Sequence, residues 1–225
     1  MLAAPPFSVN GGAPPGASPG ARLRAKGAPH LFEGGYMTEN NGHMNRICVF
    51  DIEIATPVEE CERGWAGARE GQCGLSALVI WDSISERYHV YDAYSLDRGV
   101  EHLNSADVLV SWNGLSFDAP CIEALTGVEL MPKHIDLLDL VWKALKSKTK
   151  GYRLGEVSWR TLKLKKNGTG ERAPELVEQE RWADLFDYCI NDVHLTRKLW
   201  EHIQEHMFIV DTEGEPLILM VPEVK

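Results

Sequence analysis

The sequence predicts an α/β fold in which helices pack against a mixed central sheet, and three observations support this class. Three apolar segments with strand character follow one another early in the domain. Strand and helix patterns then alternate, and helical patterns dominate the C-terminal part. The 225 residues are 44% hydrophobic and 25% charged, which suits one globular domain with a full core.

The first 43 residues differ in composition from everything that follows. Six of the twelve prolines precede Tyr36, and they are interleaved with Gly, Ala and Ser. Such a segment cannot bury enough apolar surface to offset the conformational entropy lost on ordering. We therefore predict a disordered Pro/Gly/Ala-rich tail over residues 1–43 and one domain over residues 44–225.

No targeting or membrane segment is expected from the sequence. The start lacks the uninterrupted apolar region that a secretory signal needs, and no stretch of eighteen apolar residues occurs. Five cysteines without a CxxC pair favour reduced thiols over a disulfide framework or a zinc site. We therefore expect a cytoplasmic, intracellular protein without a membrane partner.

The domain begins with an apolar, β-branched-rich segment from Arg46 to Ile54, which indicates a buried strand. A polar loop that contains Glu59, Glu60, Glu62 and Trp65 follows, up to Gly74. The next patterns indicate, in chain order, strands over residues 77–81 and 88–92, a helix over 96–104, a strand over 107–112 and a helix over 117–126.

The C-terminal half is mainly helical. A short extended piece at residues 134–136 leads into four predicted helices, over residues 137–146, 154–164, 174–179 and 181–206. Two apolar segments at residues 208–211 and 216–221 flank Thr212–Glu215 and predict a terminal hairpin.

Two carboxylates stand at the end of the first strand. Asp51 and Glu53 are separated by one residue, so their side chains face the same side of the sheet. Two solvated acids at a strand end would explain the pattern equally well if it stood alone. The apolar residues before Asp51 place the pair at the edge of a core, however, where charges need a partner.

Two further acids follow on other elements. Asp118 ends the segment Asn113–Asp118, which comes after a buried strand and opens a helix. Tyr188 and Asp192 are four residues apart on the long helix and therefore share one face. Each has an ordinary structural explanation, because an acid at a helix start is favoured by the dipole and a tyrosine can pack on a core. Taken in order, the four acids indicate a metal site.

Four carboxylates drawn from three elements suit one kind of chemistry, the hydrolysis of a phosphodiester. Hydrolysis of a phosphodiester requires an activated water and stabilised charge on the attacking and leaving oxygens, which two divalent metal ions supply. Mg²⁺ and Mn²⁺ take oxygen ligands, and Mg²⁺ keeps several waters, so a few carboxylates suffice. We therefore expect two divalent ions, Mg²⁺ or Mn²⁺, as the cofactors.

The ordered motifs Asp51-x-Glu53, Asn113-x-x-x-Phe117-Asp118 and Tyr188-x-x-x-Asp192 resemble the three exonuclease motifs of the DEDD superfamily. The stretch from Tyr188 to Thr196 looks like that of stand-alone exonuclease domains of the family-B-polymerase type and of YprB-type proteins. A His five residues before the last Asp marks the other subtype; Asp187 stands there, so the chain is similar to the tyrosine subtype. The resemblance implies a ribonuclease H-like fold and 3′→5′ exonuclease activity.

The resemblance also implies roles for the motif residues. Asp51 would bridge both metals, Glu53 and Asp192 would complete the metal on the nucleophile side, and Asp118 would hold the second metal. Tyr188 would orient the attacking water, since a phenol with a pKa near 10 is a poor base.

Charge along the chain is uneven in a way that suggests a path for substrate. The net charge is −10, which argues against a protein that coats nucleic acid through bulk electrostatics. The segment from Lys143 to Lys166 nevertheless carries a net charge of +8. It predicts a strip that guides a single strand, with Tyr152 and Trp159 as stacking surfaces, although a solvated helix face is an almost equal alternative. The residues expected to contact substrate are Asn113, Phe117, Lys146, Lys148, Lys150 and Arg153, whereas Trp112 is expected to pack in the core.

The main functional prediction is a metal-dependent exonuclease that acts on the 3′ end of single-stranded nucleic acid, with DNA favoured over RNA. Two alternatives stay open: a ribonuclease H-like endonuclease or junction nuclease, and an inactive module that binds nucleic acid. A separate polymerase or helicase is the expected protein partner, because no polymerase domain fits in the chain.

Overall fold

A computed structural model describes residues 39–40, 43–168 and 172–223 of the chain. Residues Met37–Lys225 form one compact unit. The predicted tail lies outside the described residues except at its end, where β1 (Glu39–Asn40) pairs antiparallel with β2 (His43–Met44).

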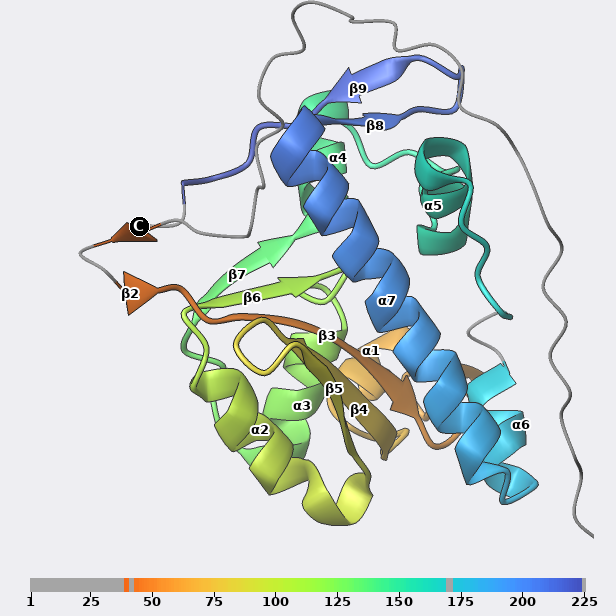
Figure 1. The fold of residues 1–225 in the computed structure, drawn as a ribbon. Coiled ribbons are helices and arrows are strands. Elements are labelled where there is room, and N and C mark those ends of the chain that lie inside the picture. The colour runs from red at the N-terminus through yellow and green to blue at the C-terminus, as the bar shows by residue number, and fades with distance from the viewer. Residues whose placement is uncertain (1–38, 41–42, 169–171, 224–225) are drawn as a thin grey trace, which may run out of the picture. The chain divides into compact units, whose positions relative to one another are not determined.

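A five-stranded mixed sheet forms the centre of the domain, in the order β5-β4-β3-β6-β7 (Figure 1). The central strand β3 pairs antiparallel with β4 on one side and parallel with β6 on the other. The α/β class with a mixed sheet is therefore confirmed. The strand bounds are β3 Ile47–Ile54, β4 Leu75–Asp82, β5 Arg87–Tyr91, β6 Val108–Ser111 and β7 Lys133–Asp136.

Helices cover both faces of this sheet (Figure 1). One face packs on α2 and α3, and the other packs on α4 to α7, with the long helix α7 crossing the strands. The bounds are α2 Leu96–Asn104, α3 Asp118–Thr126, α4 Leu137–Leu145, α5 Leu154–Leu162, α6 Arg172–Glu178 and α7 Trp182–His206, with a 3₁₀ turn η2 at Ala93–Ser95.

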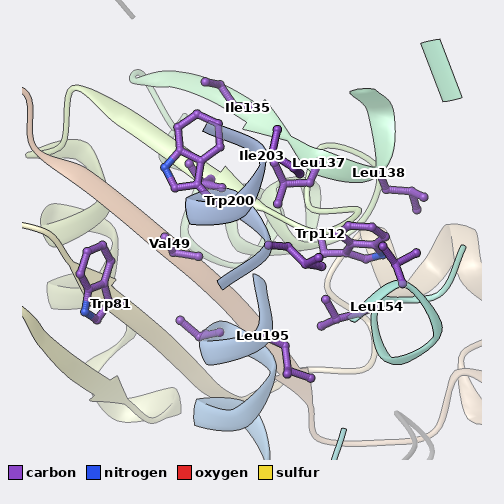
Figure 2. Packing of buried hydrophobic residues seen from close by; sticks show 14 of the residues in the cluster. Val49, Trp81, Trp112, Ile135, Leu137, Leu138, Leu154, Leu195, Trp200 and Ile203 are labelled. Atoms are coloured by element: carbon purple, nitrogen blue, oxygen red, sulfur yellow. The ribbon is translucent and has the colours of Figure 1, made fainter. Parts of the chain in front are cut away.

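Strand β3 divides its side chains between two cores because successive residues face opposite sides. Cys48 and Phe50 pack with α2 and α3, while Ile47 and Val49 pack with the α7 side. Figure 2 shows the larger core, where Trp200 and Leu195 of α7 lie over Val49 of β3. Asp51 and Glu53 alternate in step with Ile47 and Val49, so their side chains lie on the α7 face of the sheet.

The loop between β3 and β4 contains structure that the sequence did not predict. It holds a 3₁₀ turn η1 (Val58–Glu60) and a short helix α1 (Trp65–Arg69). It also folds back on itself, since the backbone N–H groups of Ala55 and Thr56 donate to the carbonyl of Cys73.

The expectation of reduced thiols is wrong for one pair of cysteines. Cys61 and Cys73 form a disulfide with their Cα atoms 5.9 Å apart, because the folded-back loop brings them together. Cys48, Cys121 and Cys189 are free and buried. An odd number of cysteines excludes complete pairing, but it does not exclude one local bridge.

The terminal hairpin is present as β8 (Phe208–Val210) and β9 (Pro216–Ile218), which pair antiparallel. Within the ranges that the structure describes, no helix has both the length and the apolar character needed to cross a bilayer.

Candidate active site

Strand β3 presents Asp51 and Glu53 toward helix α7. Glu53 is buried and Asp51 is partly exposed, and they lie opposite Ala77 and Val79 of β4, respectively. The register shifts between Glu53 and Ile54, so regular pairing is disturbed just after the second carboxylate. The two acids therefore stand at the end of a rigid strand, with apolar neighbours behind them.

Asp118 reaches the same place from the start of α3. Pairing of β3 with β6 ends at Val49 and Val110, which leaves the N–H of Ile52 without a β6 partner. The Oδ1 atom of Asp118 accepts that hydrogen bond at 3.1 Å. Since Ile52 stands between Asp51 and Glu53, this bond ties the third carboxylate to the strand that carries the first two.

A tight turn brings the chain from β6 to Asp118. Asn113 has a positive φ of 72°, a conformation that Asn tolerates better than most residues. A Cβ at Gly114 would lie 2.4 Å from Oγ of Ser111, so this position requires glycine. The Asn-Gly pair thus has a backbone role in positioning Asp118.

Asp136, which sequence reasoning did not single out, holds this turn in place. Its Oδ1 atom accepts from the N–H of Asn113 at 2.8 Å, and its Oδ2 atom accepts from the N–H of Leu115 at 3.1 Å. The same carboxylate caps α4 through the N–H of Leu138. The only signal in the sequence was an acid before a predicted helix, which pointed to a cap and not to the turn.

Helix α7 supplies the fourth carboxylate and two neighbours. Tyr188, Cys189 and Asp192 are all buried. The Sγ atom of Cys189 lies 3.5 Å from the carbonyl oxygen of Asp51 and 3.8 Å from its Oδ2. One ligand atom each from Asp51, Glu53 and Cys189 lie within 4.8 Å of one another. Cys189 could have been noticed in the sequence, because it stands three residues before Asp192 on the same helical face.

We call Asp51, Glu53, Asp118 and Asp192 the carboxylate cluster. Lys166, in the segment after α5, approaches it as a cation. Its Nζ atom lies 2.5 Å from Oδ2 of Asp192 and 5.0 Å from the centre of the Tyr188 ring. The sequence placed Lys166 at the end of a basic segment, but nothing in its spacing identified Asp192 as its partner.

Burial and mutual repulsion dominate the electrostatics of the carboxylate cluster. Burial raises the pKa values of Asp51 and Glu53 well above their usual range, and the neighbouring carboxylates add to the effect. Burial raises the pKa of Asp118 to about 7. The pKa of Asp192 is also raised by burial, although Lys166 opposes the shift. Negative charge in this cluster therefore needs more positive charge than one lysine provides.

The cluster fits hard divalent cations. Its donors are carboxylate oxygens, which Mg²⁺ and Mn²⁺ prefer. In the described part of the chain, Oδ1 of Asp192 is buried and has no hydrogen-bond partner, so this oxygen is available as a ligand. Asp51, Glu53, Asp118 and Asp192 are the residues that would hold the metal.

A second group of metal-type ligands, formed by Cys48, Asp82 and His102, is already neutralised. Asp82 accepts from the guanidinium of Arg46 at 2.9 Å and also lies near His102. The Arg46 hydrogen bonds lower the pKa of Asp82 to about 2, against the opposing effect of burial. The Arg46 guanidinium therefore supplies the positive charge in this group, which needs no metal to neutralise Asp82.

The aromatic residues expected near substrate have different positions. Trp112 is buried in the core, as expected. Phe117 is half-buried and packs edge-on against Trp65 of α1, with ring centres 5.6 Å apart. Tyr152 is 6% exposed and packs in the main core, so the prediction that it stacks on substrate is wrong; Trp159 is 46% exposed. Burial of Tyr152 follows from its place at the entry of α5, where its ring contacts the core.

The basic residues expected to contact substrate lie at one end of α5. Lys146, Lys148, Lys150 and Arg153 are exposed in or beside the connection from α4 to α5. Helix α5 has nine residues, and its rise of about 14 Å separates this end from the segment that carries Lys166. The structure thus brings Lys166 to the carboxylate cluster and leaves these four side chains at a distance along the same strip.

Comparison with known proteins identifies the class to which this fold belongs. Residues 70–204 match the model of a family described as RNase_H superfamily, RNase_H_2. The match covers more than half of the chain, and the chain therefore belongs to the RNase H superfamily. No curated protein matches the chain.

Among solved structures, the chain resembles the family B DNA polymerase from the hyperthermophilic archaeon Pyrobaculum calidifontis, with a TM-score of 0.58 and 18% identity. The similarity covers 74% of this chain and 25% of the polymerase chain, so the chain spans about a quarter of that protein. At this identity the likeness concerns the fold.

Proposed function

We propose that this protein is a metal-dependent 3′→5′ exonuclease that acts on single-stranded nucleic acid, with DNA favoured over RNA. Membership of the RNase H superfamily supports nuclease activity, and the likeness to a family B DNA polymerase is consistent with a nucleic acid substrate. The observation that carries the proposal is the approach of Asp118 to the strand of Asp51 and Glu53, on the side faced by Asp192.

In this proposal the carboxylate cluster binds two divalent metal ions. Bound there, such ions activate a water and neutralise charge on the attacking and leaving oxygens. The four carboxylates supply the negative charge that makes this binding favourable, and the elements that carry them fix their positions before metal arrives. Asp136 contributes by holding the turn that leads to Asp118.

Tyr188 acts through a neutral hydroxyl. Burial, together with the nearby carboxylates of Asp192 and Glu53, raises its pKa above the ordinary value near 10. The phenol therefore stays protonated at neutral pH and orients the attacking water through a hydrogen bond. Its position one helical turn from Asp192 suits this role.

Lys166 neutralises part of the cluster. Although burial disfavours its charged form, the neighbouring Asp192 and Tyr188 raise the pKa of Lys166, so the ammonium stays charged. We assign it the role of limiting repulsion among the carboxylates and holding Asp192 in place. The polarity of cleavage is carried over from the resemblance of the motifs to the DEDD superfamily, and the proposal of a separate polymerase or helicase partner is retained.

The test is cleavage of 5′-labelled and 3′-labelled single strands, DNA and RNA in parallel, with Mg²⁺ or Mn²⁺. We expect a ladder from the 5′-labelled DNA and immediate release of labelled mononucleotide from the 3′-labelled DNA. Asp51→Asn should abolish both signals. Asp184→Asn changes an exposed acid on α7 that is outside the carboxylate cluster, and it should leave both signals unchanged. No metal-dependent cleavage of either polymer would overturn the proposal.

A circular single strand separates the exonuclease from an endonuclease of the same superfamily. It has no 3′ end, so an exonuclease leaves it intact, whereas an endonuclease opens it. Cleavage of the circle by the wild type but not by Asp51→Asn would assign the chain to the second class.

A further inference from the structure

An exposed tryptophan lies on α5, close in sequence to Lys166, the lysine that contacts the carboxylate cluster. Trp159 projects from α5, whose buried residues include Leu154 and Val157, and it is 46% exposed. A large indole left in water loses the benefit of burial, and its exposed face is free to stack on a base.

Two lysines surround this indole. The Nζ atoms of Lys163 and Lys165 lie 5.7 Å and 5.4 Å from the centre of the Trp159 ring. Both lysines are exposed, and neither has an acidic partner among the described ion pairs. We call Trp159, Lys163 and Lys165 the indole patch.

The backbone links the indole patch to Lys166, the lysine that contacts the carboxylate cluster. After α5 ends at Leu162, the chain runs without helix or strand from Lys163 to Lys166, and its side chains alternate. Lys163 and Lys165 turn to Trp159, Leu164 packs on the core, and Lys166 reaches Asp192. Lys165 of the patch and Lys166, which contacts the carboxylate cluster through Asp192, are therefore consecutive residues with Cα atoms about 3.8 Å apart.

The chemistry of the indole patch suits one ligand class, a single strand of nucleic acid. A base can stack on the indole, and the two ammonium groups can pair with phosphates. Stacking of a base on an aromatic ring is stronger than an exposed cation–π contact, so the lysines can leave the ring for phosphates. An acidic peptide would use the lysines alone and would leave the exposed indole unexplained.

We propose that the indole patch binds the substrate strand on the 5′ side of the nucleotides held at the carboxylate cluster. This rests on the exonuclease function proposed above. The patch then sets the length of strand that the protein holds, while cleavage at the carboxylate cluster removes the nucleotide at the 3′ end of that strand.

The experiment compares a trinucleotide with a long strand of about 20 nucleotides, which exceeds the usual site size of single-strand-binding folds. The variants are Trp159→Ala and the double variant Lys163→Gln/Lys165→Gln. We expect kcat/KM for the long strand to fall about tenfold through KM, while kcat/KM for the trinucleotide stays at the wild-type value. In the lysine variant, the logarithm of the binding constant for the strand should depend less steeply on the logarithm of the salt concentration. The magnitude of this slope should decrease by about 1.4, which is about 0.7 for each of the two lost phosphate contacts.

A matched control is present on the other side of the domain. Tyr94, in the 3₁₀ turn η2, is 99% exposed, and Arg98, in the first turn of α2, is exposed as well. Tyr94→Ala/Arg98→Gln removes an exposed aromatic side chain and a positive charge. It should leave kcat/KM for both the trinucleotide and the long strand at the wild-type value. Thermal unfolding of every variant checks that the fold is retained.

Binding without cleavage separates failure of this inference from failure of the proposed function. Anisotropy of a labelled single strand is measured with Asp51→Asn, with and without Trp159→Ala. Weaker binding in the double variant supports the patch even if the wild type cleaves nothing. Equal binding, or an equal loss of kcat/KM on the trinucleotide and the long strand, would overturn it.

Discussion

The carboxylate of Asp118 accepts a hydrogen bond from the backbone N–H of Ile52 at 3.1 Å, and Ile52 separates Asp51 from Glu53. The bond occupies a position in the sheet where β6 no longer pairs with β3. Asp118 therefore has two functions that can be separated: its oxygen satisfies a buried N–H, and its charge contributes to the carboxylate cluster.

Substitutions at Asp118 should separate these functions. Asp118→Asn keeps an oxygen acceptor for Ile52, so the fold should be retained while nuclease activity falls on the order of a hundredfold or more. Asp118→Ala also leaves a buried N–H unsatisfied, which should cost about 1–3 kcal/mol of unfolding free energy. Denaturant unfolding and single-strand cleavage measure the two effects. Equal stability of the two variants would contradict the structural role.

Stability of the metal-free protein should depend on pH in an unusual direction. Burial raises the pKa of Asp118 to about 7, whereas the unfolded chain releases this proton near pH 4. Between about pH 4 and pH 7 the native state binds more protons than the unfolded state, so the unfolding free energy decreases as pH rises. Thermal unfolding in a chelator at several pH values measures this trend. The slope should be shallower in Asp118→Asn than in the wild type, and equal slopes would contradict the contribution of Asp118.

Divalent metal should reverse this loss at higher pH. The ligands must be deprotonated to bind metal, so Mg²⁺ or Mn²⁺ should raise Tm at pH 8 and have little effect at pH 5. A ligand at 100 times its Kd stabilises the native state by about 2.7 kcal/mol. Chelation should return Tm to the metal-free value. A metal-induced rise in Tm that persists in Asp51→Asn/Asp192→Asn would show that metal binds elsewhere.

Lys166→Met should destabilise the protein mainly when metal is absent. The substitution removes the partner of a buried carboxylate, Asp192, and leaves its charge uncompensated. Bound metal replaces that positive charge, so the difference in Tm from wild type should shrink when Mg²⁺ is added. Lys198→Met is the control, because it breaks the ion pair with Glu201 elsewhere on α7. A loss in Tm that is the same with and without Mg²⁺ would mean that Lys166 has a packing role alone.

Tyr188→Phe should slow cleavage by about ten- to a hundredfold and leave metal affinity close to wild type. Asp192→Asn should lose both cleavage activity and metal affinity. Calorimetric titration with Mn²⁺ and single-turnover cleavage measure the pair. If the two variants lose metal affinity equally, Tyr188 does not act by positioning water.

Removal of the Cys61–Cys73 bridge should lower stability modestly. A closed loop with a sequence separation of 12 is worth about 3 kcal/mol in the chain-entropy description. Cys61→Ser/Cys73→Ser should therefore unfold at lower denaturant concentration than the oxidised wild type. A reductant should lower the wild type to the level of the variant and leave the variant unchanged. No response of the wild type to reductant would show that the bridge adds nothing to stability.

The sequence predicted the features that depend on local pattern. The apolar run before Asp51 identified β3, and the period of two put Asp51 and Glu53 on one side. The helical period likewise placed Tyr188 and Asp192 on one face of α7, and the structure agrees.

Features that depend on contacts between distant segments could not be predicted in this way. The ion pair of Lys166 with Asp192 and the contact of Cys189 with Asp51 join separate elements, and no spacing rule connects them. Asp136 precedes a predicted helix in the sequence, but its bonds to Asn113 and Leu115 depend on the packed turn. The prediction that Tyr152 lies on the surface was wrong, because an aromatic residue in a basic segment can face either the solvent or the core.

The distance along the chain between Cys189 and Asp51, 138 residues, has a consequence for biosynthesis. Strands β3 to β7 leave the ribosome first, and at about 5–20 residues per second helix α7 follows them on the order of ten seconds later. Until it does, the growing chain has no Tyr188 and no Asp192. On the proposed function, a nascent or truncated chain is therefore unable to degrade the nucleic acids around it, and activity begins only when translation has delivered the last helix.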